Sequence, residues 1–111
     1  MIIALGDIYA RITDRDGVRE LMRSTQMRVR EQPGCEYYAF SESLDDPGHF
    51  VVTQRWQDRD ALERHYRSEA FADYQAGIGA VLVRTSELRV YEAGAGFAPV
   101  THAPIEPQRD D

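Results

Sequence analysis

Two apolar segments joined by a tight turn are the feature that most restricts how this chain can fold. Residues 35–43 and 50–56 are rich in aromatic and β-branched side chains, which favour extended strands. Between them, Asp45-Asp46-Pro47-Gly48 combines residue types that are typical of turns. We therefore predict an antiparallel hairpin in the middle of the chain.

Helical patterns flank this hairpin on both sides. On the N-terminal side, residues 13–16 offer N-cap side chains, and Gln32-Pro33-Gly34 should end the helix. On the C-terminal side, Asp58 or Asp60 should cap a short helix, and Ser68 should open a second helical segment. The inner faces that the helical spacing predicts comprise Val18, Leu21, Met22, Thr25 and Val29 in the first helix, and Phe71, Tyr74, Ile78, Val81 and Leu82 in the last.

Two further strands are expected, over residues 2–12 and 86–93. The resulting order, β-α-β-β-α-β, is that of a ferredoxin-like α+β fold with an antiparallel sheet. Its helices would cover one face of the sheet and leave apolar side chains such as Val51 on the other. Face-to-face pairing of two sheets would bury them, so we expect a homodimer in the form of a dimeric α+β barrel.

Length and composition indicate one folded domain. The chain has 111 residues, of which 42% are hydrophobic and 29% are charged, as in ordinary globular proteins. We assign residues 1–93 to this domain. Residues 94–111, with three prolines and two terminal aspartates, are expected to form a flexible tail or an arm that lies on the dimer partner.

Charge and cysteine content narrow the range of partners. A net charge of −6 without a basic cluster argues against nucleic acid or an anionic membrane as a partner. The longest apolar run, residues 76–83, is far too short to span a bilayer, and the N-terminal segment lacks the basic leader of a signal peptide. Cys35 is the only cysteine, which is compatible with a reducing compartment, so we expect a cytoplasmic protein.

Four segments resemble the antibiotic biosynthesis monooxygenase domain family, which includes the quinol-monooxygenase-like dimeric α+β barrels. They read PGCEYYAF, FVVTQRW, ALERHYRSEAF and SELRVYEA, and the resemblance covers about residues 1–93. It implies a cofactor-independent monooxygenase that acts on a small aromatic substrate, such as a quinol, an anthrone or a polyketide-like compound. No metal and no cofactor is expected, and the chain has no Gly-x-Gly-x-x-Gly sequence.

The resemblance also implies site residues. Trp56 matches the family tryptophan at the end of the third strand, and His65 matches the histidine of the quinol-monooxygenase-like branch. In anthrone-oxidising members an asparagine precedes the tryptophan by four residues and a tyrosine follows it by six; here these positions are Val52 and Leu62. Haem-degrading members use an asparagine on the first strand and a histidine on the later helix. This chain lacks asparagine and has Gln75 at the later position, so haem degradation is not expected.

The residues themselves leave two readings open for each candidate. Trp56 shares the helix-covered strand face with Phe50, Val52 and Gln54, where it could stack on a planar ligand or fill a corner of the core. His65, with an ordinary pKa of about 6.5, suits a general base for a phenol, but could equally be a buried histidine that hydrogen-bonds a neighbour. Aromatic side chains that could line a pocket, or form plain core, are Tyr38, Phe40, Phe71 and Tyr74.

Polar candidates are few. Asp7, inside the apolar first strand, could face the pocket or could pair with Arg55 or Arg89 at the dimer partner, and we favour the pairing. His49 and His102 should be solvated, and scattered histidines do not form a metal site. The candidate catalytic residues are therefore His65 and Trp56, and the candidate substrate contacts are Tyr38, Phe40, Val52, Phe71, Tyr74, Asp7 and Arg55.

Two other functions compete with a monooxygenase. One is a non-catalytic dimeric barrel that binds a small hydrophobic ligand, and the other is an isomerase that uses the same pocket. A fully packed core around Trp56 would favour ligand binding or assembly, whereas a pocket of a few hundred Å³ would favour an enzyme.

Overall fold

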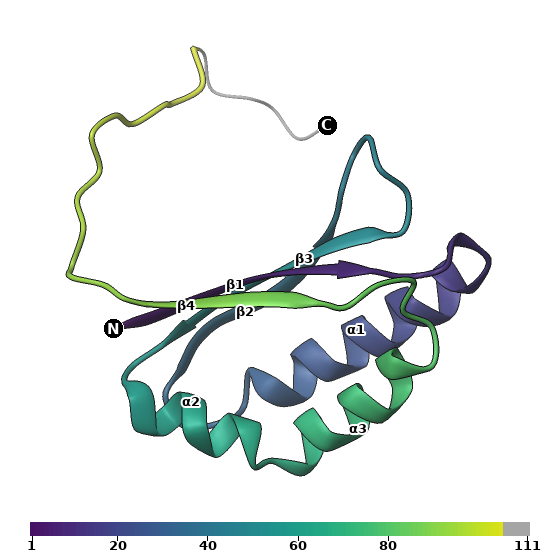
Figure 1. Cartoon of the computed structure of the whole chain (residues 1–111). Helices are drawn as coiled ribbons and strands as arrows, with labels where there is room; N and C mark the ends of the chain where they lie inside the picture. Colours follow the sequence, from purple (N-terminus) through teal and green to yellow (C-terminus); the bar gives the residue numbers. More distant parts are fainter. Residues whose placement is uncertain (106–111) are drawn as a thin grey trace, which may run out of the picture.

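The computed structural model describes residues 1–105 and confirms the predicted fold class. Four antiparallel strands form one sheet in the order β2-β3-β1-β4, and α1, α2 and α3 all lie on one side of it (Figure 1). The elements are β1 (Ile2–Tyr9), the 3₁₀ turn η1 (Ile12–Asp14), α1 (Arg15–Val29), β2 (Cys35–Glu42), β3 (His49–Trp56), α2 (Arg59–Tyr66), α3 (Glu69–Gly79) and β4 (Glu87–Glu92).

The helix starts on the C-terminal side of the hairpin follow the predicted caps. The Asp58 carboxylate accepts a hydrogen bond from the Ala61 backbone N–H at 2.8 Å, and the Ser68 hydroxyl accepts one from the Phe71 N–H at 3.2 Å. Ser68 also donates to the backbone carbonyl of His65 at 2.6 Å. These bonds satisfy otherwise unpaired helix-terminal groups and fix the corner between α2 and α3.

The connection from β1 to α1 differs from the prediction. The first strand ends at Tyr9 instead of residue 12, because its neighbour β3 begins at His49. The Ala10 N–H still donates to Gly48 O at 2.8 Å, and η1 then follows. Asp14 stands at the N-cap of α1, but its side chain makes no cap hydrogen bond. Its carboxylate instead accepts a bond from Arg11 Nε at 2.9 Å.

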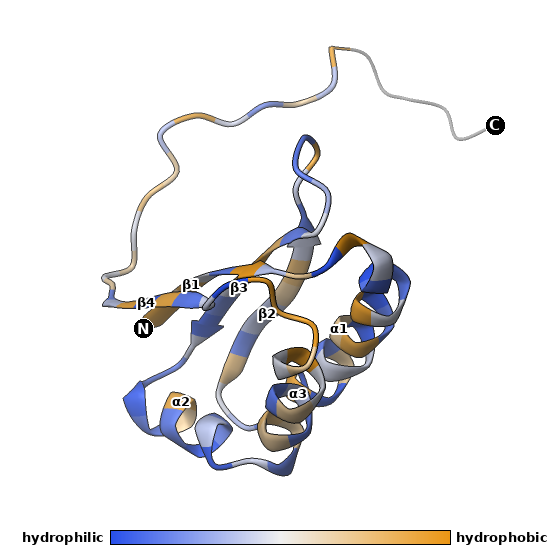
Figure 2. Cartoon of the chain, turned by 45° about the vertical axis from the view of Figure 1, so that its right-hand side comes forward, coloured by the Kyte–Doolittle hydropathy of each residue, from blue (hydrophilic) through white to orange (hydrophobic). Residues whose placement is uncertain are grey.

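The end of α3 also differs from the prediction, which extended the helix to Leu82. The helix ends at Gly79, and residues 81–83 run beside the end of β1. Arg11 N–H donates to Val81 O, and Val83 N–H donates to Tyr9 O, both at 2.9 Å. Figure 2 shows this segment as apolar, next to the sheet. Strand-like pairing of residues 81–83 is favoured over a longer helix because Gly77 and Gly79 destabilise the last helical turns.

The core fills the layer between the sheet and the helices. The predicted stripe of α1 is buried at Val18, Met22, Thr25 and Val29, and Leu21 packs against its edge. Opposite it, alternate residues of β1 and β3 point inward, as the period of two requires. Those buried on the sheet are Ile2, Ala4, Ile8, Phe50, Val52, Gln54 and Trp56. Burying each large apolar side chain contributes about 1.5–3 kcal/mol to stability.

The other face of the sheet has no helix over it among residues 1–105 (Figure 1). Apolar side chains lie open there: Leu5 is 43% exposed and Tyr91 is 48% exposed. No helix in this described part of the chain is long and apolar enough to cross a membrane. After β4, residues 94–105 form no helix or strand and run away from the sheet, while residues 106–111 of the expected tail lie outside the described residues.

Gly34 explains why a Pro-Gly sequence follows the first helix. Its φ of +82° is a left-handed conformation that side chains disfavour, and its carbonyl accepts the Gln57 N–H at 2.8 Å. A Cβ added to Gly34 would lie 2.5 Å from the Cβ of Ala61 in α2. The absence of a side chain at Gly34 therefore lets α2 pack closely against the loop before β2.

Replacing Gly34 by alanine should destabilise the fold. We expect Gly34→Ala to lower the free energy of unfolding by about 2–4 kcal/mol, because strain at positive φ adds to a steric clash. Gly17→Ala is the matched control. Gly17 lies in α1, an added Cβ meets no atom within 4 Å, and this variant should gain about 0.5 kcal/mol. Urea unfolding of both variants measures the difference, and equal effects would contradict the role assigned to Gly34.

Candidate functional site

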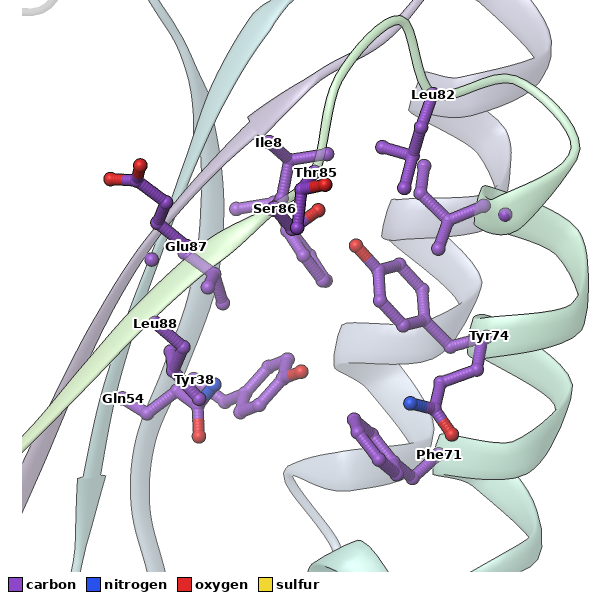
Figure 3. Close-up of a pocket in the computed structure, with 16 residues that line it drawn as sticks. Ile8, Tyr38, Gln54, Phe71, Tyr74, Leu82, Thr85, Ser86, Glu87 and Leu88 are labelled. Carbon is purple, nitrogen blue, oxygen red and sulfur yellow. The ribbon is translucent and has the colours of Figure 1, made fainter.

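A cavity of about 440 Å³ lies between the sheet and α3. Figure 3 shows Tyr38, Gln54 and Leu88 on the sheet side, with Phe71 and Tyr74 of α3 opposite them. The wall is mainly apolar, and the apolar side chains that line it include Ile8, Phe40, Val52, Phe71, Ile78, Leu82 and Leu88. Thr85, Ser86 and Glu87 line one end, where the Glu87 carboxylate points away from the cavity (Figure 3).

Strand register and helix periodicity bring this wall together. Tyr38 and Phe40 of β2 lie opposite Gln54 and Val52 of β3 on the same sheet face. From α3, Phe71, Tyr74 and Ile78 follow each other at intervals of three and four residues and so share one side of the helix. Five of the seven predicted substrate contacts line the cavity: Tyr38, Phe40, Val52, Phe71 and Tyr74. Their roles toward a ligand stay predictions.

Gly6 helps to keep the cavity open. It lies on the inner face of β1, opposite Val52 of β3 and Leu88 of β4, and it lines the cavity. A Cβ there would approach Val52 Cγ1 to 2.9 Å and Leu88 Cδ1 to 3.0 Å. A glycine inside a strand can mark a place where space is needed, and Gly6 is such a place.

Trp56 and His65, the predicted catalytic pair, do not line this cavity. Their side chains are buried, with 0% of Trp56 and 1% of His65 exposed, and their rings stack with centroids 4.9 Å apart. The His65 ring lies 5.5 Å from that of Tyr38 and 5.1 Å from that of Phe71. Because Tyr38 and Phe71 are themselves wall residues, the Trp56–His65 pair forms a packed layer behind the wall. Trp56 therefore fills a corner of the core, which was the other reading of its sequence position.

The environment of His65 keeps its imidazole neutral. Nδ1 lies 2.9 Å from Gln32 Oε1, which can only accept, so Nδ1 carries the proton. The free Nε2 is the one buried side-chain nitrogen or oxygen among residues 1–105 that has no hydrogen-bond partner. Burial lowers the pKa of His65 to about 4. In this arrangement His65 is a weak base without access to the cavity.

Three of the polar residues that line the cavity, Tyr38, Tyr74 and Gln54, carry neutral hydrogen-bond donors. Burial raises the pKa of the Tyr38 and Tyr74 phenols well above their ordinary value, and the proximity of Tyr74 raises that of Tyr38 further. Both hydroxyls therefore stay protonated at physiological pH. Gln54 adds a side-chain amide whose oxygen accepts a hydrogen bond from Trp56 Nε1 at 2.9 Å. Strand alternation predicted that Gln54 lies on this face, but no local pattern marked it as a site residue.

Asp7 and Arg55, the two charged residues predicted as substrate contacts, lie on the opposite face of the sheet. Asp7 Oδ1 is 2.8 Å from His49 Nε2, and the His49 ring stacks on Tyr9 with centroids 4.5 Å apart. Arg55 lies over the ring of Tyr37 at 5.7 Å. Strand alternation separates both side chains from the cavity, so neither can contact a ligand bound there. The expectation that His49 is solvated was also wrong, since Asp7 and Tyr9 hold its ring.

Comparisons with known proteins agree on one family. The profile described as antibiotic biosynthesis monooxygenase matches residues 1–77. Rv0793 of Mycobacterium tuberculosis, provisionally named a monooxygenase, is 33% identical over 70 residues, which cover 63% of this chain and 68% of that protein. Its solved structure superimposes with a TM-score of 0.80 at 26% identity, over 87% of this chain and 98% of that one.

One further structure of similar fold and one further protein of similar sequence extend the comparison. The fold of a Deinococcus radiodurans protein, described provisionally as an antibiotic biosynthesis monooxygenase, superimposes with a TM-score of 0.86 at 24% identity, over 91% of this chain and all of that one. The uncharacterized Synechocystis protein sll1783 is 23% identical over 91 residues, which are 82% of this chain. The match spans 62% of the length of that relative.

The buried state of His65 should make stability depend on pH. Above about pH 6.5 the imidazole is neutral in both the folded and the unfolded chain. As the pH falls further, the His65 imidazole takes up a proton in the unfolded chain but stays neutral in the folded chain until about pH 4. The free energy of unfolding therefore decreases over this range. Thermal unfolding between about pH 7 and about pH 4.5 should therefore show a smaller loss of Tm in His65→Gln than in the wild type.

His102→Gln is the matched control for this experiment, because His102 is exposed. It should keep the wild-type pH dependence. A His65→Gln variant that loses as much Tm on acidification as the wild type would contradict the neutral, buried state of His65.

Proposed function

This chain belongs to the antibiotic biosynthesis monooxygenase family, and on that premise we propose that it is a cofactor-independent monooxygenase of a small, flat aromatic substrate such as a quinol or an anthrone. The observation that carries the proposal is the cavity between the sheet and α3. Its volume of about 440 Å³ lies within the range of small-molecule sites. Its wall combines apolar side chains with a few neutral hydrogen-bond donors, the composition expected of a pocket that binds an aromatic ring carrying oxygen.

The proposed reaction needs no external reductant. An anthrone ring CH₂ group and O₂ give a C=O group and one molecule of water, so the substrate supplies all the electrons that reduce the second oxygen atom. Triplet O₂ reacts slowly with closed-shell molecules, but an electron-rich phenolate or enolate can transfer one electron to it, and the radical pair then combines. What the protein must supply is a site that binds the ring, favours its anion and excludes water.

The cavity-lining residues suit these tasks. The Tyr38 and Tyr74 hydroxyls stay protonated and can donate hydrogen bonds to an anionic substrate oxygen. The apolar side chains around them keep water away, which strengthens each such bond. The low pKa and the sealed Nε2 of His65 make it a poor acceptor for the substrate proton, so the proton leaves to solvent as the ring enters the cavity, before water is excluded. His65 and Trp56 support the wall from behind, and the direct catalytic roles that the sequence suggested for them stay predictions.

A second candidate function is favoured by one observation. The core around Trp56 is fully packed, which is what a non-catalytic barrel that binds a small hydrophobic ligand would show. An isomerase could use the same pocket, and dependence on O₂ separates a monooxygenase from both alternatives.

The same proposal includes a homodimer. The uncovered sheet face exposes Leu5 and Tyr91, and a second copy packed on it would remove these apolar side chains from water. The charged residues Asp7, Arg55 and Arg89 would then lie near the partner, and residues beyond 93 could reach it as an arm. Light scattering that gives the mass of one chain at high concentration would contradict this part. The cytoplasmic location expected from the single cysteine stays a prediction.

Oxygen uptake tests the proposed reaction. In metal-free buffer, dithranol or a dihydroxynaphthalene should give enzyme-dependent uptake above the spontaneous rate. Tyr74→Phe, which removes one donor to the anion and keeps the ring, should lower kcat by about 10–100-fold. Tyr37→Phe is the matched control, because Tyr37 lies on the other sheet face, and it should keep the wild-type rate.

Uptake by the wild type that Tyr74→Phe leaves unchanged would exclude the assigned role of Tyr74. No uptake with any of these substrates, together with measurable binding of them, would favour the ligand-binding alternative.

A further inference from the structure

Gln54 is a polar side chain in a place where polar groups are costly. It lies on the inner face of β3, between β1 and β2, with Ala4 and Tyr38 as its register partners. Only 4% of the residue is exposed. An amide in such a position destabilises the fold unless hydrogen bonds satisfy it. The contacts of Gln54 therefore need an explanation.

The bond from Trp56 fixes which way the Gln54 amide points. The indole Nε1–H can only donate, so the group 2.9 Å away must be the amide oxygen, Oε1. The amide nitrogen, Nε2, must then point elsewhere. Trp56 itself is held by the stacked ring of His65, whose Nδ1 is bonded to Gln32. A chain of contacts from α2 through Trp56 thus sets the orientation of one amide.

The amide nitrogen of Gln54 is left with its two N–H groups unused. Within residues 1–105, Gln54 Nε2 donates no hydrogen bond to a protein group. It is nevertheless not completely buried, because the one completely buried side-chain nitrogen or oxygen without a partner in this range is His65 Nε2. Gln54 lines the cavity beside Tyr38 (Figure 3). A nearly buried donor in the wall of a cavity is suited to an acceptor on a bound molecule.

From this arrangement we infer that Gln54 is a ligand-binding residue. Its Nε2–H₂ group donates a hydrogen bond to the phenolic, enolic or carbonyl oxygen of a flat aromatic molecule in the cavity, and Trp56 is the positioning residue that holds the amide in place. The inference rests on the proposed function for the class of ligand, but it concerns binding and requires no turnover.

The neighbouring groups favour an oxygen acceptor over other ligands. Tyr38 and Tyr74 are also neutral donors, and the one carboxylate at the cavity, that of Glu87, points away from it (Figure 3). A ligand that offered only donors or a positive charge would leave these three donors unpaired. An oxygen that carries negative charge gains most, because bonds to a charged acceptor are about twice as strong as bonds between neutral groups.

Anaerobic equilibrium dialysis with two matched ligands tests the inference. Dithranol carries the ring oxygens, and 9,10-dihydroanthracene has the same three-ring frame without oxygen. Gln54→Met should weaken dithranol binding by about 10–100-fold, because a bond to a charged oxygen is lost. It should change dihydroanthracene binding by less than about threefold, because the apolar volume is kept. Gln57→Met, an exposed glutamine outside the cavity, is the control and should bind both ligands as the wild type does.

The role of Trp56 is tested by a double-mutant cycle. If Trp56 acts through Gln54, Trp56→Phe should weaken dithranol binding in the wild-type background but have no further effect once Gln54 is methionine. The double variant also removes both partners of the buried hydrogen bond, so neither is left unpaired. If Gln54→Met does not fold, the double variant can therefore take its place and be compared with Trp56→Phe.

Three results would overturn the inference: unchanged dithranol affinity in the variants that lack Gln54, an equal loss for both ligands, or failure of the wild type to bind dithranol. Additive effects of the two substitutions would remove the positioning role of Trp56. The proposed reaction is tested independently of this inference. Dithranol binding that depends on Gln54, without any oxygen uptake, would leave the inference intact and overturn the proposed monooxygenase reaction. Oxygen uptake, with binding that does not depend on Gln54, would overturn the inference and leave the proposed reaction intact.

Discussion

Burial of the Trp56 indole between β3 and α2 is the constraint on which the rest of the site depends. The indole stacks on His65, and its only polar atom donates to Gln54. Because an indole N–H without an acceptor would be costly in this setting, the amide of Gln54 is held in one orientation. The position of α2, and with it His65, depends in turn on Gly34, whose missing side chain allows the close approach to Ala61. A backbone feature between α1 and β2 thus determines how a side chain at the cavity is presented.

The cavity exists because α3 and the sheet do not close on each other. Gly6 leaves space on the inner face of β1, and the chain turns back along β1 after Gly79 instead of continuing as a helix. What remains is an apolar space beside neutral donors, which suits a molecule that must lose a proton and meet O₂ away from water. In the proposed reaction, the protein contributes binding and electrostatics, and the reactivity belongs to the substrate.

Much of the fold was predictable from local chemistry. The hairpin turn, the caps at Asp58 and Ser68 and the buried stripe of α1 depend on residues within a few positions of each other, and all of them are present. The boundaries at Tyr9 and Gly79 were not predictable, because residues 9–11 and 81–83 pair with each other across seventy or more positions of sequence, as the bond from Val83 to Tyr9 shows. The sequence predicted which face Trp56 occupies, but not that the cavity would open beside Gln54. Whether a buried tryptophan is wall or core depends on where α3 packs, and no local pattern contains that information.

The side-chain ¹⁵N spectrum of the protein with bound dithranol, recorded without oxygen, tests the central claim most directly. We predict that the Gln54 amide signal moves when the ligand binds, while His65 keeps the signature of a neutral ring that is protonated at Nδ1. An unchanged Gln54 signal together with a His65 imidazolium would contradict it. That result would make His65 the base that takes the substrate proton, and Trp56 and His65 would then belong to the wall of the reactive site rather than to the core behind it.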